Sequence, residues 1–302
     1  MTDKLDLGDS RWNVRVAPSL GGSLLACSYD GVPVLHPVVQ SPWPGHPAVR
    51  CCHFPLIPFS NRIQNGRFSF NGSPMRLAQN IAGSPHAIHG HGWQAAWQVA
   101  ERRDAGCTLT YQQEPSADWP WRYRGRQTIA VAGDALRLTL AIENLGPDAM
   151  PCGLGFHPFL PRSAGARLEL EADQVWNGTA GDFPTARVDV PAELDFRTGP
   201  MLSEREGTDH CFDGWKRRAT VRYAQGPRTL ILEGCEETAY AIVYIPEGGD
   251  YFCVEPVTHA VNAMNHADAA AGGLWTLAPG ATREIRMTIQ VEGTVTSGAH
   301  RR

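Results

Sequence analysis

Short stretches in which apolar and polar residues alternate recur along almost the whole chain. A period of two is typical of β-strands that bury one face, and β-branched and aromatic residues are frequent in these stretches. Turn-forming Gly, Pro, Asn and Asp residues separate them at short, fairly even intervals. The predicted strands span residues 11–16, 66–70, 108–111, 127–131, 136–142, 167–170, 219–223, 229–232, 239–245, 251–254 and 283–291.

Helical periodicity does not extend over a useful length anywhere in the sequence. The Ala-rich segment 267–271 is too short for a stable helix and is followed by Gly272 and Gly273. Asn71 and Gly72, by contrast, form a dipeptide typical of a two-residue hairpin turn. The pattern therefore predicts an all-β protein built as a large antiparallel β-sandwich, with a barrel as the related alternative.

The length of 302 residues would allow two domains, but all-β domains often exceed the usual domain size. The sequence contains no Pro/Ser/Gly linker, charge block or low-complexity run that would divide it. We therefore expect one domain over residues 1–302.

Composition limits the class of partner. The formal net charge is −4 at pH 7, which disfavours nucleic acid and anionic membranes as main partners. Residues 1–4 lack the apolar core of a signal peptide, and no segment has the length of a membrane span, so we expect a cytoplasmic protein. The eight cysteines lack the paired spacing of a zinc site, which predicts buried free thiols.

Three segments far apart in the sequence place titratable residues in apolar or turn-forming settings. The segments are 58–63 together with 88–90, then 153–159, and finally 251–256. They contain Arg62 with His89, then His157, and then Glu255. A His and a Glu in one cleft can move protons in opposite directions, because their surroundings can set different protonation states.

The motifs in and around these segments resemble those of the aldose 1-epimerase (galactose mutarotase) family. The matching runs are FPLIPFSNRIQNGRF at 54–68, HAIHG at 86–90, GFHPF at 155–159, DHCF at 209–212, VEP at 254–256 and LAPG at 277–280. They occur in the family's order across nearly the whole chain. The resemblance implies a galactose mutarotase-like β-supersandwich that binds a small-molecule sugar and interconverts its α and β anomers, an isomerase without cofactor or metal.

The resemblance also implies roles for individual residues. Glu255 matches the general base that takes the proton from the anomeric hydroxyl, and His157 matches the general acid that protonates the ring oxygen. The sugar-binding positions match Arg62, His89 and Asp209, with Asn61 as a weaker candidate. Phe159 stands where the family often has Tyr, and residues 90–92 differ from galactose-specific members. These differences bear on which aldose is the substrate.

The two proton-transfer candidates have physical support and also structural alternatives. Glu255 ends an apolar strand, where desolvation raises the pKa of a carboxyl group. Without the resemblance, a strand-end Glu paired with an Arg would be the ordinary interpretation. Pro158 restricts the backbone of His157, which alone would more often be a core histidine. The resemblance favours the acid–base roles of both residues.

The binding candidates have structural alternatives as well. The planar guanidinium of Arg62 suits sugar hydroxyls, and a structural salt bridge is the competing role. His89 precedes Gly90, which permits close backbone approach, and a turn histidine is the alternative. Asp209 lies in a stretch rich in acidic residues, where a solvated carboxylate is the alternative.

Three other functions compete with a mutarotase. His86, His89 and His91 raise the hypothesis of a cupin-like metal site, which the absence of Asp and Glu from 92–100 and the neighbouring glycines disfavour.

A non-catalytic sugar-binding module is the second alternative, because the chain has nine Trp residues and aromatic faces pack against sugars. The Trp candidates are Trp93, Trp97, Trp119, Trp121 and Trp215.

An epimerase acting on a phosphorylated hexose is the third alternative. It would need basic side chains at the cleft rim, and the candidates are Arg67, Arg76, Arg122, Arg124 and Arg126. The sequence leaves open the choice of aldose and whether the protein is a monomer or a homodimer.

Overall fold

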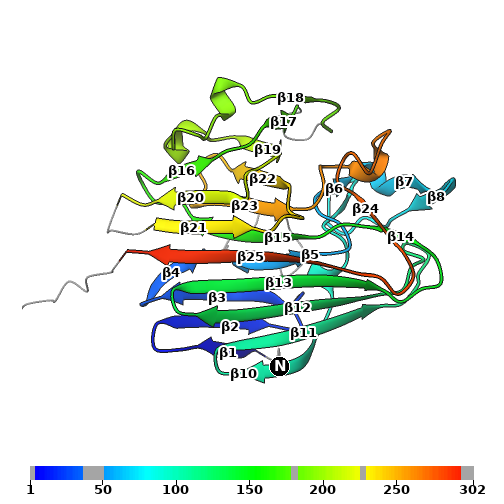
Figure 1. The fold of residues 1–302 in the computed structure, drawn as a ribbon, viewed down its shortest axis with the longest axis horizontal. Helices are drawn as coiled ribbons and strands as arrows, with labels where there is room; N and C mark the ends of the chain where they lie inside the picture. Colours follow the sequence, from blue (N-terminus) through cyan, green and yellow to red (C-terminus); the bar gives the residue numbers. More distant parts are fainter. Residues whose placement is uncertain (1–3, 37–50, 178–182, 225–228, 294–302) are drawn as a thin grey trace, which may run out of the picture.

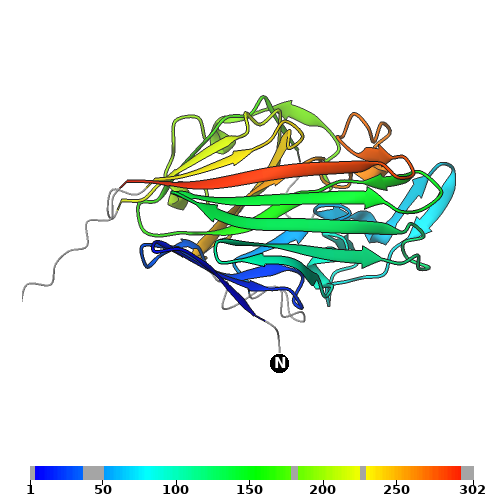
Figure 2. The ribbon, with the colours of Figure 1, turned by 60° about the horizontal axis from the view of Figure 1, so that its bottom comes forward.

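Two large antiparallel sheets carry most of the regular structure (Figure 1). The structure is a computed structural model that describes residues 4–36, 51–177, 183–224 and 229–293. The sheets pack face to face as two layers, which Figure 2 shows with the longer strands of the smaller sheet in view. The predicted all-β sandwich is thus confirmed.

The larger sheet has eleven strands in the order β1-β2-β3-β5-β15-β23-β22-β19-β17-β18, with β4 paired to β3. Its strands are β1 (Leu5–Gly8), β2 (Trp12–Ala17), β3 (Ser23–Tyr29), β4 (Val32–Leu35), β5 (His53–Leu56), β15 (Gly155–Pro161), β17 (Gln174–Trp176), β18 (Arg187–Asp189), β19 (Thr208–Asp213), β22 (Tyr240–Ile245) and β23 (Tyr251–Val257).

The smaller sheet has eight strands in the order β10-β11-β12-β13-β25-β21-β20-β16. Its strands are β10 (Gln98–Arg103), β11 (Gly106–Gln113), β12 (Tyr123–Ala132), β13 (Ala135–Asn144), β16 (Arg167–Leu170), β20 (Arg218–Arg222), β21 (Thr229–Gly234) and β25 (Thr282–Glu292).

Three two-stranded ribbons and several 3₁₀ turns complete the regular structure of the described residues. The ribbons are β6 (Arg62–Ile63) with β9 (Ala87–Ile88), β7 (Arg67–Phe70) with β8 (Ser73–Arg76), and β14 (Met150–Cys152) with β24 (Trp275–Leu277). The 3₁₀ turns are η2 (Gln64–Gly66), η3 (Gly92–Gln94), η4 (Ala192–Leu194), η5 (Leu202–Glu204) and η6 (Ala263–Asn265). The described residues contain no α-helix, and none of their helical segments is long and apolar enough to cross a membrane.

The core between the sheets follows from strand alternation. In β25 the side chains of Ile285, Met287 and Ile289 are buried, whereas Glu284 and Arg286 face solvent. Burial of apolar surface stabilises such a layer by roughly 25 cal/mol per Å². One face of each such strand thus supplies the core. The alternation of apolar and polar residues in the sequence indicates which face is buried.

The central strands β15 and β23 differ, because they are buried on both faces. Phe156 and Val254 point into the core between the sheets. Phe159 and Cys253 belong to a second apolar cluster on the opposite face. This second face, called the outer face of the larger sheet, carries the titratable residues of the candidate site.

Each sequence-predicted strand coincides with an observed one within a few residues. The hairpin at Asn71 and Gly72 joins β7 to β8, with positive φ angles of 50° and 78° at these two residues. This is the conformation that Asn-Gly favours in two-residue turns. Several short strands escaped prediction, among them β5 and β15, which contain Pro55 and Pro158.

Candidate active site

His157 and Glu255 face each other from the adjacent strands β15 and β23. The two strands pair Gly155 with Val257 and Phe159 with Cys253, and this register puts His157 directly opposite Glu255. Pro158 and Pro256, beside these two residues, have no N–H to donate to a sheet ladder. The strands therefore hold the two side chains on the same outer face, at a point where backbone pairing is interrupted.

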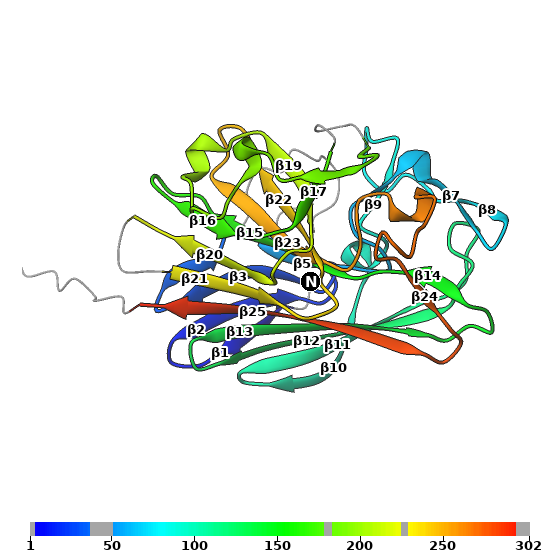
Figure 3. The same ribbon diagram turned by 45° about the horizontal axis from the view of Figure 1, so that its top comes forward.

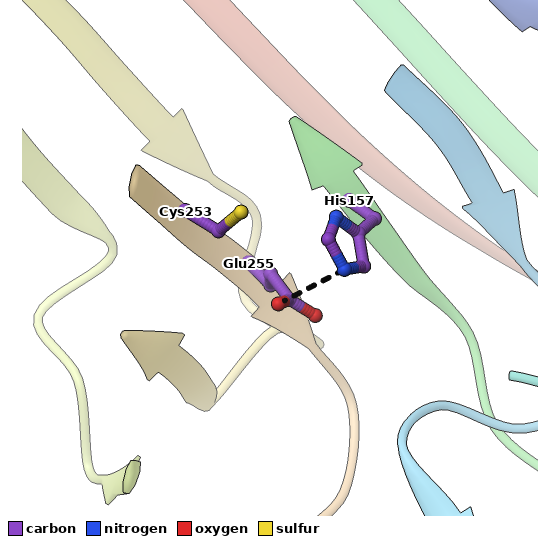
Figure 4. Close-up of side chains that lie close together, drawn as sticks. All are labelled: His157, Cys253 and Glu255. Carbon is purple, nitrogen blue, oxygen red and sulfur yellow. Dashed lines mark ion pairs between the residues drawn. The ribbon is translucent and has the colours of Figure 1, made fainter. Parts of the chain in front are cut away.

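The two side chains are in contact and almost fully shielded from solvent. His157 Nε2 lies 3.3 Å from Glu255 Oε1, and the side chains are 2% and 4% exposed. Figure 4 shows this contact, with the thiol of Cys253 on the same side of β23 as the Glu255 carboxyl group. Residues two apart on a strand share a face, which explains why Cys253 joins the pair.

Aromatic rings fix the orientation of the His157 imidazole. Phe54 stacks on it at a centroid distance of 4.4 Å, and Phe159 lies 4.7 Å away at a tilt of 33°. The His89 ring meets it edge-on at 5.3 Å. Such packing limits the imidazole to one orientation, which a group that transfers a proton to a defined atom requires.

Burial shifts the two titratable groups in opposite directions. Desolvation lowers the pKa of His157 to about 3. Desolvation also raises the pKa of Glu255 well above its usual value; nearby Asp209 raises it further, and Arg62 opposes the shift. Both shifts favour the uncharged form of each group, a neutral His157 beside a protonated Glu255, so that one proton is held between the two groups.

A tight loop next to this pair positions His89, Asn61 and Arg62. His89 Nδ1 accepts a hydrogen bond from the Asn61 backbone N–H at 3.1 Å, and Asn61 Oδ1 accepts one from the Arg62 N–H at 2.8 Å. Because Nδ1 is an acceptor, the neutral His89 ring carries its proton on Nε2. The His89 ring is therefore a hydrogen-bond donor through Nε2.

Gly90 makes the position of His89 possible. Its φ angle is +71°, and a Cβ there would lie 2.1 Å from the carbonyl oxygen of Ile57. Glycine is the residue that tolerates both conditions. The close backbone approach expected at Gly90 is present. It holds the loop that contains His89 against the segment that precedes Arg62.

Arg62 and Asp209 form a second polar pair near the first. Arg62 Nη1 lies 3.7 Å from Asp209 Oδ2, and the side chains are 29% and 17% exposed. Asp209 lies on β19 opposite Tyr244 of β22, and Tyr244 in turn lies opposite Cys253. Asp209 is therefore partly buried on the outer face rather than a solvated carboxylate, and all six candidate residues lie in one region.

The sequence did not point to the residues that support this region. The Asn80 side chain donates to the carbonyls of Ile88 and Gly90 and accepts from the N–H of Ile88. The ring of His259 accepts a hydrogen bond from the Ser60 N–H at 3.1 Å. Both side chains bind backbone groups, and the alternation of apolar and polar residues in the sequence does not indicate such contacts. Cys253, by contrast, was detectable as the residue two positions before Glu255.

The cupin-like arrangement of three histidines is not formed. His86 accepts from the Asn65 N–H, while the ring of His91 packs on Trp119, 5.7 Å away, rather than beside His89. These residues lie in turns and short bridges, and turn geometry separates side chains that a continuous strand would align.

One group of donor atoms does converge in the part of the chain that the structure describes. Nitrogen, sulfur and oxygen donors of His157, Cys253 and Glu255 all lie within 4.8 Å of one another, and zinc accepts such a set. Burial, however, raises the pKa of the Cys253 thiol and of the Glu255 carboxyl, and both must lose a proton to bind a metal. The group therefore fits proton transfer better than a resident metal.

Most of the proposed aromatic and basic additions lie away from the site. The five Trp candidates are between 0% and 7% exposed. The core between the sheets contains Trp97, Trp119, Trp121 and Trp215, whereas Trp93 belongs to the apolar cluster of the outer face, and its ring meets the His89 ring edge-on at 6.5 Å. Arg124 and Arg126 lie on β12 of the smaller sheet, and Arg124 pairs with Glu143. These two arginines therefore lie away from the outer face around Glu255.

The comparisons with known proteins agree on one family. A family model described as aldose 1-epimerase matches residues 5–290. Two proteins of Escherichia coli K12 are similar in sequence. The uncharacterized protein YphB is 29% identical over 300 residues, covering 96% of each chain, and the uncharacterized protein YihR is 29% identical over 222 residues, covering 70% of each.

Solved structures share the fold. A protein of Escherichia coli K12 described as a candidate aldose 1-epimerase has a TM-score of 0.86 and 28% identity, covering 97% of this chain and 99% of that one. A galactose mutarotase-like protein from Clostridium acetobutylicum has a TM-score of 0.83 and 18% identity, covering 96% and 95%. Galactose 1-epimerase from Lactobacillus acidophilus has a TM-score of 0.76 and 16% identity, with the same coverage. The last two similarities show the fold alone.

Proposed function

This chain belongs to the aldose 1-epimerase family, and we propose that it is a mutarotase that interconverts the α and β anomers of a free aldose. The observation that carries the proposal is the buried, face-to-face contact of His157 with Glu255 at 3.3 Å. A general acid and a general base must both reach the hemiacetal centre, where the anomeric hydroxyl and the ring oxygen share one carbon. Two opposed side chains of this kind meet that requirement.

The reaction follows from the two proton transfers. In the proposed mechanism, Glu255 takes the proton from the anomeric hydroxyl while His157 protonates the ring oxygen. The bond between the anomeric carbon and the ring oxygen then breaks, giving the open-chain aldehyde. Rotation about the bond next to the carbonyl presents its other face, and reclosure with the two protons returned yields the opposite anomer.

The shared proton of the pair matches this mechanism. Catalysis needs Glu255 ionised and His157 protonated. This form of the pair carries the same number of protons as a neutral His157 beside a protonated Glu255. A single transfer across the 3.3 Å contact converts one form into the other. Burial favours the neutral form in the empty site, and a bound sugar that accepts from His157 and donates to Glu255 favours the active one.

The neighbouring polar groups suit the remaining hydroxyls. Arg62 offers planar donors and Asp209 offers carboxylate acceptors, with 29% and 17% of the side chains exposed. His89 and Asn61, linked by their hydrogen bond, complete the proposed set. The cysteines form no disulfide in the described structure, which suits the reducing conditions of the cytoplasm, where we propose that the reaction takes place.

The site favours neither of two other functions. A binding module needs no buried acid–base pair, whereas His157 and Glu255 are both present and opposed. A phosphorylated hexose needs several cations beside the site, and Arg62 is already paired with Asp209.

The experiment is a polarimetric screen of anomer exchange with galactose, glucose, arabinose, xylose and hexose 6-phosphates. The proposal predicts acceleration over the buffer rate for at least one free aldose. Acceleration of a phosphorylated hexose alone would favour the alternative substrate class.

A further inference from the structure

The segment that follows Glu255 binds the backbone of the segment that carries Arg62. Three of its side chains, spaced three residues apart, form hydrogen bonds with main-chain groups there. The bonds join His259 to Ser60 at 3.1 Å, Asn262 to Gln64 at 3.0 Å and Asn265 to Arg67 at 2.9 Å. Figure 3 shows this orange segment, around η6, beside β7 and β9. The two segments are far apart in the sequence, and these bonds hold one against the other on both sides of Arg62.

The ring of His259 carries its proton on a defined nitrogen. Its Nε2 accepts from the Ser60 N–H, so the proton of the neutral ring lies on Nδ1, which donates to the Ala260 carbonyl at 2.8 Å. Ser60 and His259 are each 2% exposed. Burial lowers the pKa of His259 to about 4, so the ring is neutral at pH 7. His259 therefore offers Nε2 as a hydrogen-bond acceptor in a place shielded from solvent.

The segment that carries His157 meets the same ring. A Cβ on Gly153 would lie 2.0 Å from His259 Cδ2, so only a residue without a side chain fits there. The Gly153 N–H also donates to the Pro58 carbonyl at 2.7 Å. The three segments that form the candidate site thus converge on His259.

Ser60 lies directly before the residues that carry polar groups of the site. Asn61 has a left-handed φ angle of +53°, and its N–H donates to His89 Nδ1 at 3.1 Å. Its side chain accepts from the Arg62 N–H at 2.8 Å. Such a backbone conformation is held by its surroundings. Without an acceptor, the Ser60 N–H would be a buried unsatisfied donor, and the segment would have to shift to satisfy it.

We propose that His259 and Asn262 are positioning residues for sugar binding. They hold the backbone on both sides of Arg62 and thereby keep its guanidinium at a fixed place relative to Glu255. The proposal rests on the mutarotase function argued above, in which Arg62 contacts the hydroxyls of a sugar whose anomeric centre lies at Glu255. The acid–base pair itself is set by the register of β15 and β23. Loss of either positioning residue should therefore weaken sugar binding far more than it slows proton transfer.

The first test compares His259→Leu with His259→Gln. Because Leu removes the acceptor, KM should rise about tenfold while kcat falls less than about threefold. A Gln side chain can place its Oε1 near the position of Nε2 and accept from Ser60, so His259→Gln should recover most of the loss in KM. Polarimetry with the aldose that wild type exchanges fastest gives KM and kcat, and circular dichroism gives the folded fraction.

A purely structural role gives a different pattern, because partial unfolding lowers kcat per mole of protein and leaves KM unchanged. Met287→Ala, at a buried position of β25 in the smaller sheet, is the control for lost stability. It should lower the unfolding free energy without raising KM. An unchanged KM in folded His259→Leu overturns the proposed role, as does an equal rise in KM in His259→Leu and His259→Gln.

Asn262→Gly tests the same segment without a conformational penalty. Asn262 has a φ angle of +59°, which glycine adopts readily, so the change removes the acceptor of the Gln64 N–H and keeps the backbone conformation. KM should rise about threefold or more, with kcat nearly unchanged. This variant also decides the matter if His259→Leu does not fold, because a folded Asn262→Gly with the KM of wild type then overturns the proposal.

Failure of this proposal and failure of the mutarotase function are distinguishable. Absence of accelerated exchange with all sugars overturns the mutarotase function itself. Calorimetric affinity for the same aldoses then decides on the positioning residues. Binding that is about tenfold weaker in His259→Leu and recovered in His259→Gln supports them. Equal affinity in the three proteins, or absence of sugar binding by wild type, overturns them.

Discussion

His157 and Glu255 stand opposite each other across the one interval of the β15–β23 register where prolines follow both residues. Their contact is 3.3 Å long and lies almost fully out of solvent. Proline removes backbone donors from this interval, so the two side chains meet where the sheet ladder is weakest. The proposed catalysis depends on this relationship, because acid and base must reach one hemiacetal centre together.

The first prediction concerns the general base. Glu255→Gln keeps the shape of the side chain but removes proton acceptance, so the exchange rate should fall by about 100-fold or more. The measurement is polarimetry on the aldose that wild type exchanges fastest, with circular dichroism to show that the variant is folded. Near-normal turnover in a folded variant would remove Glu255 from the mechanism.

The pH dependence of the rate follows from the shared proton. The pair gains a second proton only as pH falls toward the lowered pKa of His157, about 3. It loses its proton only above the usual carboxyl range, because burial raises the pKa of Glu255. The acid limb of kcat/KM against pH should therefore lie below about pH 5. An acid limb near the pKa of a solvated histidine, about 6.5, would contradict the assignment.

Stability should fall in acid because of buried neutral histidines such as His53. This ring is fully buried, and burial lowers its pKa to about 3. Because the folded-state pKa lies below the unfolded value, its contribution is complete above about pH 6.5 and is lost as pH falls from there toward 3.

Replacing this histidine removes its share of the pH dependence. For His53→Leu, the drop in unfolding free energy between pH 7 and pH 5 should be smaller than in wild type by about 2 kcal/mol. Urea denaturation of both proteins at the two pH values gives the comparison. An identical drop in both proteins would show that His53 is protonated in the folded state.

Chelation should leave the exchange rate unchanged. Proton transfer by His157 and Glu255 supplies the acid and the base, and burial keeps the nearby Cys253 thiol protonated and a poor metal ligand. The assay is exchange after extensive dialysis against EDTA, with and without added Zn²⁺. Loss of activity on chelation and its recovery with Zn²⁺ would instead assign the His157–Cys253–Glu255 group to a metal.

The sequence predicted strands well where alternation is regular and poorly where proline interrupts it. Residues 136–142 were predicted as a strand, and β13 spans Ala135–Asn144. Strand β15 was not predicted, although it carries His157, because Gly155 and Pro158 suggest a loop. Its neighbours on both sides supply the pairing that its own residues do not signal, so tertiary context overrides local propensity.

The candidate site shows the same division. Motif resemblance identified six residues, and the structure brings all of them into one region of the outer face. It could not identify Asn80, because that side chain binds the backbone of Ile88 and Gly90. A single sequence carries no direct record of such tertiary contacts.

Replacement of His157 by Asn tests the central claim most directly. Opening the ring requires a proton on a poorly basic oxygen, so His157→Asn should lower the exchange rate by about 100-fold. Sugar affinity should change far less, because Arg62, His89 and Asp209 still contact the hydroxyls in the proposed complex. The measurement pairs magnetisation transfer between anomeric proton signals with calorimetric affinity for the same sugar. A wild-type protein that binds aldoses without accelerating exchange, and a variant that changes affinity alone, would contradict the proposed acid–base catalysis.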